Sequence, residues 1–252
     1  MNSRFLSIIF AATFALPLVS AENALDDTMQ KPQSFKKKIT TTVSANYLLF
    51  LPRGYETKGP KRWPLMLFLH GAGERGTNLS KVTIHGPPKI VKNRPDFPFI
   101  LVSPQCPEGE VWSNETLLAL LDEVFQKHKV DTNRVYLTGL SMGGYGTWSL
   151  GVRYPERFAA IAPICGGGET ISVLLAGRQK GAALKSLGVW AFHGAKDPTV
   201  KLEESERMIA ALKKAGVKDV ELTIYPDAQH DSWTETYANE KLYDWFLKHE
   251  RK

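Results

Sequence analysis

The chain has 252 residues, of which 43% are hydrophobic and 23% are charged, and it carries a formal net charge of +6. This composition is close to that of globular domains and excludes disordered and collagen-like chains. The 2 cysteines exclude a disulfide scaffold. Their positions, Cys106 and Cys165, resemble no metal-ligand spacing, so no metal site is expected. The basic excess forms no stripe interleaved with aromatic residues, so no nucleic-acid partner is expected.

The N-terminus is typical of a secretory signal. Arg4 precedes an apolar run over residues 5–19, and a small-x-small cleavage pattern follows at Ala21. The run is about 15 residues long, short of the roughly 20 that a membrane span needs. We therefore expect a secreted or periplasmic protein without membrane attachment after cleavage. The expected segments are a signal peptide over residues 1–21, a flexible N-terminus over 22–35 and one folded domain over 36–252.

The first expected elements of this domain are strands. Residues 37–43 and 47–51 are β-prone and predict a hairpin, in which Lys36 to Lys38 form a solvated edge. Residues 64–69 and 97–103 are short, continuous apolar runs. Such runs are typical of strands buried on both faces of a parallel sheet.

Helices and strands then alternate along the chain. Ser113 is expected to cap an amphipathic helix over residues 116–128. Further strands are expected over 135–138, 159–164, 189–192 and 221–225, and further helices over 141–153, 203–215 and 238–249, with one crossover helix after 164. This alternation predicts an α/β fold with a mostly parallel sheet. In such sheets the functional groups gather at the carboxyl ends of the strands.

A G-x-S-x-G motif, Gly139 to Gly143, lies between an expected strand and an expected helix. At such a turn the central serine, Ser141, is strained and its hydroxyl is exposed at the sheet edge. Glycines are needed on both sides, because side chains there would meet the neighbouring strand and helix. The alternative interpretation is a glycine-rich turn in which Ser141 only caps the helix.

A serine nucleophile needs a base to accept its proton. Of the 6 histidines, His230 lies on a loop after the last strand, where its ring can turn toward Ser141. His70 and His193 end strands before glycines, and we interpret them as structural hydrogen-bonding residues. His230 is therefore the predicted base.

The base needs an acid that orients its ring. Asp197 follows the penultimate strand, whereas Asp227 and Asp231 flank His230 and are too near in sequence to reach the correct ring nitrogen. The chain order serine, aspartate, histidine is that of α/β-hydrolases. We predict Asp197 as the acid; alternatively it is an ordinary turn residue before a proline.

Two backbone N–H groups are expected to bind an oxyanion. One belongs to Met142, directly after the serine, and the other to Ala72, in the loop after the strand over residues 64–69. The small residues Gly71 and Gly73 let a substrate approach that backbone. The alternative for this loop is a flexible turn without a role.

Five segments of the sequence resemble α/β-hydrolase serine esterases. They are residues 69–76 (LHGAGERG), 103–107 (SPQCP), 139–144 (GLSMGG), 193–197 (HGAKD) and 230–233 (HDSW). Over about residues 36–250, the chain is similar to the bacterial phospholipase/carboxylesterase and dienelactone-hydrolase-like groups, which are related to feruloyl esterases and polyhydroxybutyrate depolymerases. The resemblance implies a sheet with helices on both faces, no large cap domain and no cofactor. True dienelactone hydrolases carry a cysteine where this chain has Ser141. The exact dienelactone hydrolase activity is therefore not expected.

The substrate site is expected to be open, since only about 23 residues separate the strands that end near Cys165 and begin near Val189. Aromatic platforms suit sugar rings and aromatic acids. Trp112 and Trp233 could provide such platforms, and the alternative is that each packs against loops at the rim. The candidate substrate contacts are Trp112, Trp233, Gln105 and His85.

The strand order of this family also bears on the two cysteines. It places the strands before Cys106 and Cys165 about three spacings apart, roughly 14 Å, which favours free thiols over a bridge.

The sequence thus predicts a secreted serine carboxylesterase that acts through an acyl-enzyme, with feruloyl or acetyl esters of plant polysaccharides as the expected substrates. One alternative is a prolyl-oligopeptidase-like serine peptidase, although no propeller domain is present. The other is a non-catalytic carbohydrate-binding protein on a hydrolase fold. The sequence does not indicate an oligomeric state.

Overall fold

The computed structural model describes residues 31–251 of the chain. Residues 42–251 belong to one compact unit. Residues 31–41, which belong to a separate unit, have no regular secondary structure and are exposed. The expected signal peptide over residues 1–21 lies outside the described residues.

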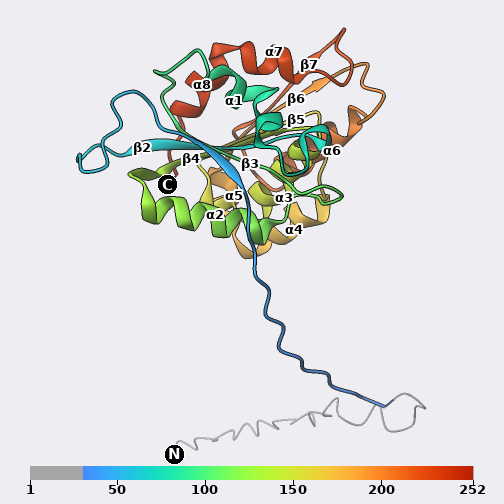
Figure 1. The fold of residues 1–252 in the computed structure, drawn as a ribbon. Coiled ribbons are helices and arrows are strands. Elements are labelled where there is room, and N and C mark those ends of the chain that lie inside the picture. The colour runs from blue at the N-terminus through green and yellow to red at the C-terminus, as the bar shows by residue number, and fades with distance from the viewer. Residues whose placement is uncertain (1–30, 252) are drawn as a thin grey trace, which may run out of the picture. The chain divides into compact units, whose positions relative to one another are not determined.

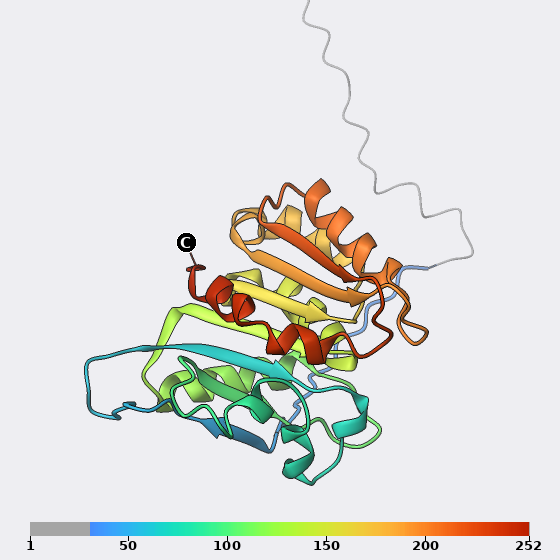
Figure 2. The same ribbon diagram turned by 90° about the horizontal axis from the view of Figure 1, so that it is seen from above.

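The compact unit is built on one sheet of seven strands in the order β1-β3-β2-β4-β5-β6-β7. β1 pairs antiparallel with β3, and all other neighbours pair parallel. Figure 2 shows the strands side by side from above. This arrangement confirms the expected α/β class with a mostly parallel sheet. The strands are β1 (Tyr47–Phe50), β2 (Trp63–Leu69), β3 (Ile100–Pro104), β4 (Val130–Leu140), β5 (Ala160–Ile164), β6 (Gly188–Gly194) and β7 (Val220–Tyr225).

Helices cover both faces of this sheet (Figure 1). On one face lie α2 (Asn114–Lys127), α3 (Met142–Arg153), α4 (Thr170–Gln179), α5 (Gly181–Ser186) and α6 (Glu203–Lys214). On the other face lie α1 (Gly86–Ile90), α7 (Trp233–Ala238) and α8 (Glu240–Leu247). Between β5 and β6 the chain forms two short helices, α4 and α5, where one was expected, and residues 165–187 include no cap domain.

The two faces of the sheet have separate hydrophobic cores. In β2, Leu65, Leu67 and Leu69 pack into the core under α2, α3 and α6, whereas Met66 and Phe68 pack into the core under α7 and α8. Successive side chains of a strand point to opposite faces, so a strand covered on both sides must be apolar throughout. This is why β2 appears in the sequence as a continuous apolar run.

The predicted hairpin over residues 37–51 is wrong in its first half. β1 forms and pairs with β3, but residues 37–43 form no strand. The large apolar side chains of that segment, Ile39 and Val43, are exposed. Because these side chains stay exposed, little burial of apolar surface is available to offset the entropy cost of ordering a strand here.

The loops after β2 also hold elements that the sequence pattern does not indicate. They are the 3₁₀ turns η2 (Ala72–Glu74) and η3 (Leu79–Thr83) and the helix α1, and beyond them the turn η4 (Pro155–Arg157) and the helix α7. All are 3 to 6 residues long, too short to show a hydrophobic period.

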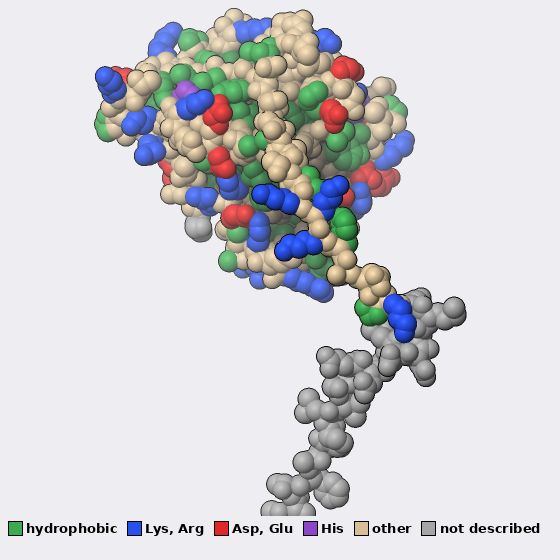
Figure 3. All heavy atoms as spheres, turned by 60° about the horizontal axis from the view of Figure 1, so that its bottom comes forward, with side chains coloured by type: hydrophobic (Ala, Val, Ile, Leu, Met, Phe, Trp, Pro, Cys, Tyr) green, Lys and Arg blue, Asp and Glu red, His purple; other side chains and the backbone are tan. Residues whose placement is uncertain are grey.

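The surface carries charges of both signs. On the face shown in Figure 3, Lys and Arg side chains are interspersed with Asp and Glu side chains. Within residues 31–251, no helix combines the length and the hydropathy that a membrane crossing requires.

Candidate active site

The turn between β4 and α3 presents Ser141. Ser141 has φ 53° and ψ −117°, a positive φ that is strained for a residue with a side chain. The turn is tight: a Cβ on Gly139 would lie 2.5 Å from Gly143 O, and a Cβ on Gly143 would lie 2.0 Å from Leu69 O. Only glycine fits at both positions, so the motif is explained by close backbone packing around an exposed serine.

Three side chains from three strand ends form one series of hydrogen bonds. The distance from Ser141 Oγ to His230 Nε2 is 2.9 Å, and that from His230 Nδ1 to Asp197 Oδ2 is 2.7 Å. A carboxylate only accepts, so Nδ1 carries the proton and Nε2 accepts from the Ser141 hydroxyl. The structure therefore brings together the three residues predicted for nucleophile, base and acid. This arrangement can pass the serine proton to His230.

Asp197 is buried, with 4% of its surface exposed. Its Oδ1 accepts from the backbone N–H of Thr199 at 2.8 Å and of Val200 at 2.9 Å. Burial by itself raises the pKa of Asp197, but the hydrogen bonds from His230, Val200 and Thr199 outweigh it, and the pKa lies below its usual value. Asp197 is thus held as a carboxylate facing the histidine.

The two aspartates beside His230 serve elsewhere. Asp227 is exposed and pairs with Lys196 Nζ at 2.6 Å. Asp231 accepts from Thr234 N at 2.9 Å and from Thr234 Oγ1 at 2.8 Å, which places it at the start of α7. Neither carboxylate is bonded to His230.

The two predicted N–H donors each begin a helix. Ala72 is the first residue of η2, and Met142 is the first residue of α3. The first N–H groups of a helix have no partner within it and carry a partial positive charge. A Cβ built on Gly71 would lie 3.6 Å from Ser141 Cβ, so the η2 loop lies directly against the serine. An anion above Ser141 can therefore accept from both groups.

His70 and His193 have structural roles, as expected. His70 Nε2 accepts from Cys106 N at 3.0 Å, so its Nδ1–H donates to Gly71 O at 2.6 Å. Burial lowers the pKa of His70, which keeps the ring neutral. His193 contacts Ser205 Oγ at 2.7 Å and Val200 O at 2.9 Å, and both rings are buried.

A groove of about 640 Å³ begins at Ser141 and runs between α3, α4 and α6. Aromatic rings form one part of its lining and arginines another. The lining includes Trp112, Tyr145, Trp148, Arg153 and Arg207. Trp112, one of the predicted substrate contacts, lies in this lining. The other four were not predicted, although Tyr145 follows Ser141 by four residues, a helical spacing that puts the two on one face.

The remaining predicted substrate contacts do not line this groove. Gln105 is buried, and its Nε2 donates to Glu74 O at 2.7 Å and Asn78 O at 2.9 Å, so it supports the loop after β2. Trp233 begins α7 rather than lying on a loop, and its ring packs edge-on against those of His230 and His85 at 5.3 Å and 5.5 Å. The contacts of Gln105 join segments about 30 residues apart, so neighbouring residues give no signal for them, whereas Trp233 and His230 lie three residues apart on one segment.

Cys106 and Cys165 are both free and buried. Burial raises the pKa of each thiol, that of Cys165 to about 12. A raised pKa disfavours the thiolate, which is the reactive form of cysteine. Within residues 31–251, no group of three or more His, Cys, Asp or Glu side chains is arranged to hold a metal ion.

Parts of the chain are similar to curated proteins. Poly(3-hydroxyalkanoate) depolymerase C of Paucimonas lemoignei is 44% identical over 60 residues, which is 24% of this chain and 14% of that protein. The bifunctional acetylxylan esterase/xylanase XynS20E of Neocallimastix patriciarum is 26% identical over 150 residues, or 57% of this chain and 20% of that protein. The chain spans less than half the length of the curated relatives it matches.

Solved structures and family models extend the comparison. The crystal structure of a thermostable esterase superposes with a TM-score of 0.67 and 32% identity, over 84% of this chain and 60% of that one. Its likeness confirms an α/β-hydrolase fold. The model of the phospholipase/carboxylesterase family matches residues 109–243, more than half of the chain, and this segment contains Ser141, Asp197 and His230. The chain therefore belongs to the phospholipase/carboxylesterase family.

Proposed function

We propose that the protein is a serine carboxylesterase that hydrolyses its substrates through an acyl-enzyme. The observation that carries the proposal is the unbroken series of hydrogen bonds from Ser141 through His230 to the buried Asp197. Family membership and the likeness to a thermostable esterase support ester bonds as the target.

In the first half of the reaction, Ser141 Oγ attacks the ester carbonyl carbon while its proton passes to His230 Nε2. Asp197 stays ionised and stabilises the imidazolium. The carbonyl oxygen, now negative, accepts from the Ala72 and Met142 N–H groups. His230 then protonates the leaving alcohol, which breaks the ester bond and leaves the acyl-enzyme.

In the second half, water takes the place of the alcohol. His230 accepts a proton from the water, whose oxygen attacks the acyl carbon and forms a second oxyanion at the same two N–H groups. Collapse of that intermediate breaks the bond to Ser141 Oγ, which regains its proton from His230. The acid is released, and no cofactor enters either half.

For the substrate we propose feruloyl or acetyl esters of plant polysaccharides, met by a secreted or periplasmic enzyme. The aromatic groove lining supports a flat aromatic or sugar group beside the ester. The relative named as an acetylxylan esterase supports the same class. The apolar run over residues 5–19 supports export.

A panel of substrates tests this proposal. Purified protein is assayed on p-nitrophenyl acetate, methyl ferulate, acetylated xylan, a phospholipid, polyhydroxybutyrate and a peptide p-nitroanilide, with Ser141→Ala as the blank. Ester turnover that the blank lacks, highest on methyl ferulate or acetylated xylan, is expected. Turnover of the peptide alone would indicate a peptidase. Binding to xylan without turnover of any substrate would indicate a carbohydrate-binding protein.

A further inference from the structure

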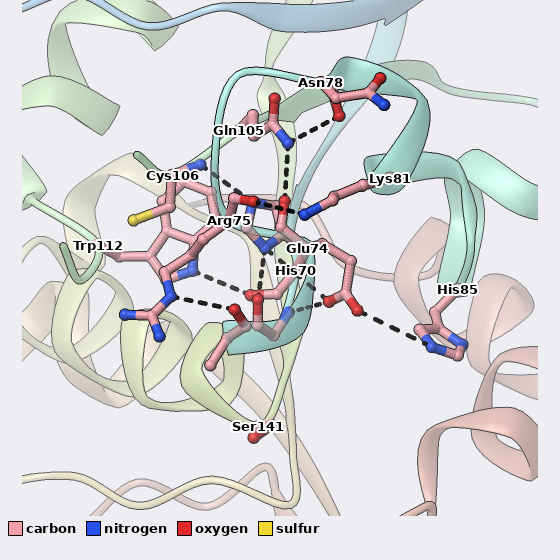
Figure 4. Close-up of polar contacts among 12 residues, drawn as sticks. His70, Glu74, Arg75, Asn78, Lys81, His85, Gln105, Cys106, Trp112 and Ser141 are labelled. Atoms are coloured by element: carbon pink, nitrogen blue, oxygen red, sulfur yellow. Dashed lines mark hydrogen bonds and ion pairs between the residues drawn. The ribbon is translucent and has the colours of Figure 1, made fainter. Parts of the chain in front are cut away.

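The loop after β2 is held at three backbone groups beside the Ala72 N–H. Gly71 O accepts from His70 Nδ1 at 2.6 Å, Ala72 O accepts from Arg75 Nε at 3.0 Å, and Gly71 N donates to Glu74 Oε2 at 2.9 Å (Figure 4). A peptide group is planar, so fixing Gly71 O also fixes the direction of the Ala72 N–H, which points the opposite way. The loop is thus built to aim one donor.

Glu74 is an unusual member of this group, because it is a buried carboxylate with 8% of its surface exposed. Within residues 31–251, Gly71 N is its one hydrogen-bond donor. The nearest basic groups are His70 Nδ1 and His85 Nε2, each 4.0 Å from a Glu74 oxygen. No Lys or Arg pairs with it among those residues. A carboxylate is costly to bury, so its place here is explained by the one N–H that it holds.

The backbone of Glu74 is fixed from the opposite side. Gln105 Nε2 donates to Glu74 O at 2.7 Å, and Trp112 Nε1 donates to His70 O at 3.1 Å. In Figure 4, Gln105 lies near the top of the view, Trp112 at the left and Ser141 at the bottom. The backbone is thus held at His70, before the loop, and at Glu74 itself. Held in this way, the Glu74 carboxylate can anchor the Gly71 N–H.

We propose that Glu74 is a positioning residue of the esterase reaction, and this rests on the proposed function. By holding the Gly71 N–H, its carboxylate sets the loop so that the next N–H, that of Ala72, meets the oxyanion above Ser141. Hydrogen bonds weaken steeply with distance and angle. An oxyanion donor acts only where the charge develops, so a small shift of the loop lowers the rate without closing the groove.

Three variants test the anchor. Glu74→Leu removes the acceptor, Glu74→Asp keeps the charge but withdraws the carboxylate by one methylene, and Glu74→Gln keeps an oxygen within reach. Loss of a whole oxyanion donor costs about 10²–10³ in kcat. We expect Glu74→Leu to lower kcat by about tenfold to a hundredfold, Glu74→Asp by a smaller factor, and Glu74→Gln by at most about threefold, with KM nearly unchanged.

A second measurement separates positioning from general damage to the fold. An aryl boronic acid forms a tetrahedral adduct on Ser141 that places an oxygen at the two N–H groups. Its inhibition constant is expected to rise in each variant by about the factor by which kcat/KM falls. The exposed Glu108, in the neighbouring loop, provides the matched control Glu108→Leu, which is expected to keep wild-type values and melting temperature.

The outcomes are distinct. If the wild-type protein hydrolyses no ester, the proposed function and this inference both fail. If wild-type activity is normal and Glu74→Leu keeps its kcat, only the positioning role fails. Should Glu74→Leu not fold, the comparison of Glu74→Asp with Glu74→Gln decides, and an aspartate variant as active as the glutamine variant overturns the proposal.

Discussion

At the residue scale, the site depends on one strained serine beside a second strained residue. Ser141 and Cys165 are the two non-glycine residues with positive φ in the described chain, at 53° and 39°. Ser141 N donates to Ile164 O, next to Cys165, whose own N donates to Phe192 O. Such conformations cost about 1–3 kcal/mol each and persist only where the surroundings impose them. The ends of β4, β5 and β6 impose them here.

Ser141→Ala is expected to lower kcat by at least roughly 10³-fold, because only oxyanion binding and substrate binding remain. Steady-state kinetics on p-nitrophenyl acetate measure the loss. A fluorophosphonate followed by peptide mass spectrometry is expected to label Ser141 alone. Label on another serine, or an active alanine variant, would refute its assignment as nucleophile.

Asp197→Asn is expected to lower kcat by at least about 10²-fold, because an amide no longer holds the His230 Nδ1 proton. The matched variants Asp227→Asn and Asp231→Asn are expected to stay within about threefold, since those carboxylates bond to Lys196 and Thr234. The three are compared by kcat on one ester. An equal loss in all three would show that nearby charge matters rather than the bond to His230.

The lowered pKa of Asp197 also predicts how stability depends on pH. A carboxyl whose folded pKa lies below its unfolded value stabilises the fold above about pH 4, and this contribution is lost as pH falls through the folded pKa. Urea unfolding of wild type and Asp197→Asn at pH 7 and pH 3 measures it. Wild type is expected to lose more stability between the two pH values than the variant does, and parallel losses would contradict the assignment.

Among the elements, β4 and α3 position the serine, because their backbones approach each other more closely than a side chain at Gly139 would allow. The backbone of α3 at Gly143 lies against the end of β2, and Gly144 lies against the end of β5. Helix packing of this closeness brings the positive end of α3 to the site. The same contact seats Met142 and its N–H beside Ser141.

Gly143→Ala is expected to destabilise the fold by at least about 3 kcal/mol, because the added Cβ would lie 2.0 Å from Leu69 O. Gly181→Ala is the matched control: Gly181 begins α5, and its added Cβ meets nothing within 4 Å. Alanine is the better helix former, so this change is expected to be neutral or stabilising by up to about 1 kcal/mol. Thermal unfolding compares the two, and similar melting temperatures would contradict the close-packing argument.

Across the whole molecule, aromatic side chains lie in two places around Ser141. One set lines the groove between α3, α4 and α6, and Trp233 lies beside His230. The two aromatic sets therefore act differently. Tyr145 is exposed on the groove wall, where it can stack on a substrate ring. Trp233 packs edge-on against the ring of His230, where it can hold that ring in place.

This difference predicts opposite kinetic signatures. Tyr145→Ala is expected to raise KM for methyl ferulate by about threefold to tenfold and to leave p-nitrophenyl acetate nearly unchanged. Trp233→Ala is expected to lower kcat on both esters by a similar factor. Steady-state kinetics on the two esters separate the cases. A selective effect of Trp233→Ala on methyl ferulate would place that ring in the substrate site instead.

The amino-acid sequence alone predicts the alternation of strands and helices, the sharp turn at Ser141 and the residues expected at each strand end. These follow from local patterns: apolar runs buried on two faces, glycines at a crowded turn, and the chain order of Ser141, Asp197 and His230. The folded structure is needed to show that residues 37–43 form no strand, that Gln105 supports a loop, and that Tyr145, Arg153 and Arg207 line the groove. Those outcomes depend on contacts between segments far apart in the chain, where burial and hydrogen-bond partners are set by the packed sheet and helices rather than by neighbouring residues.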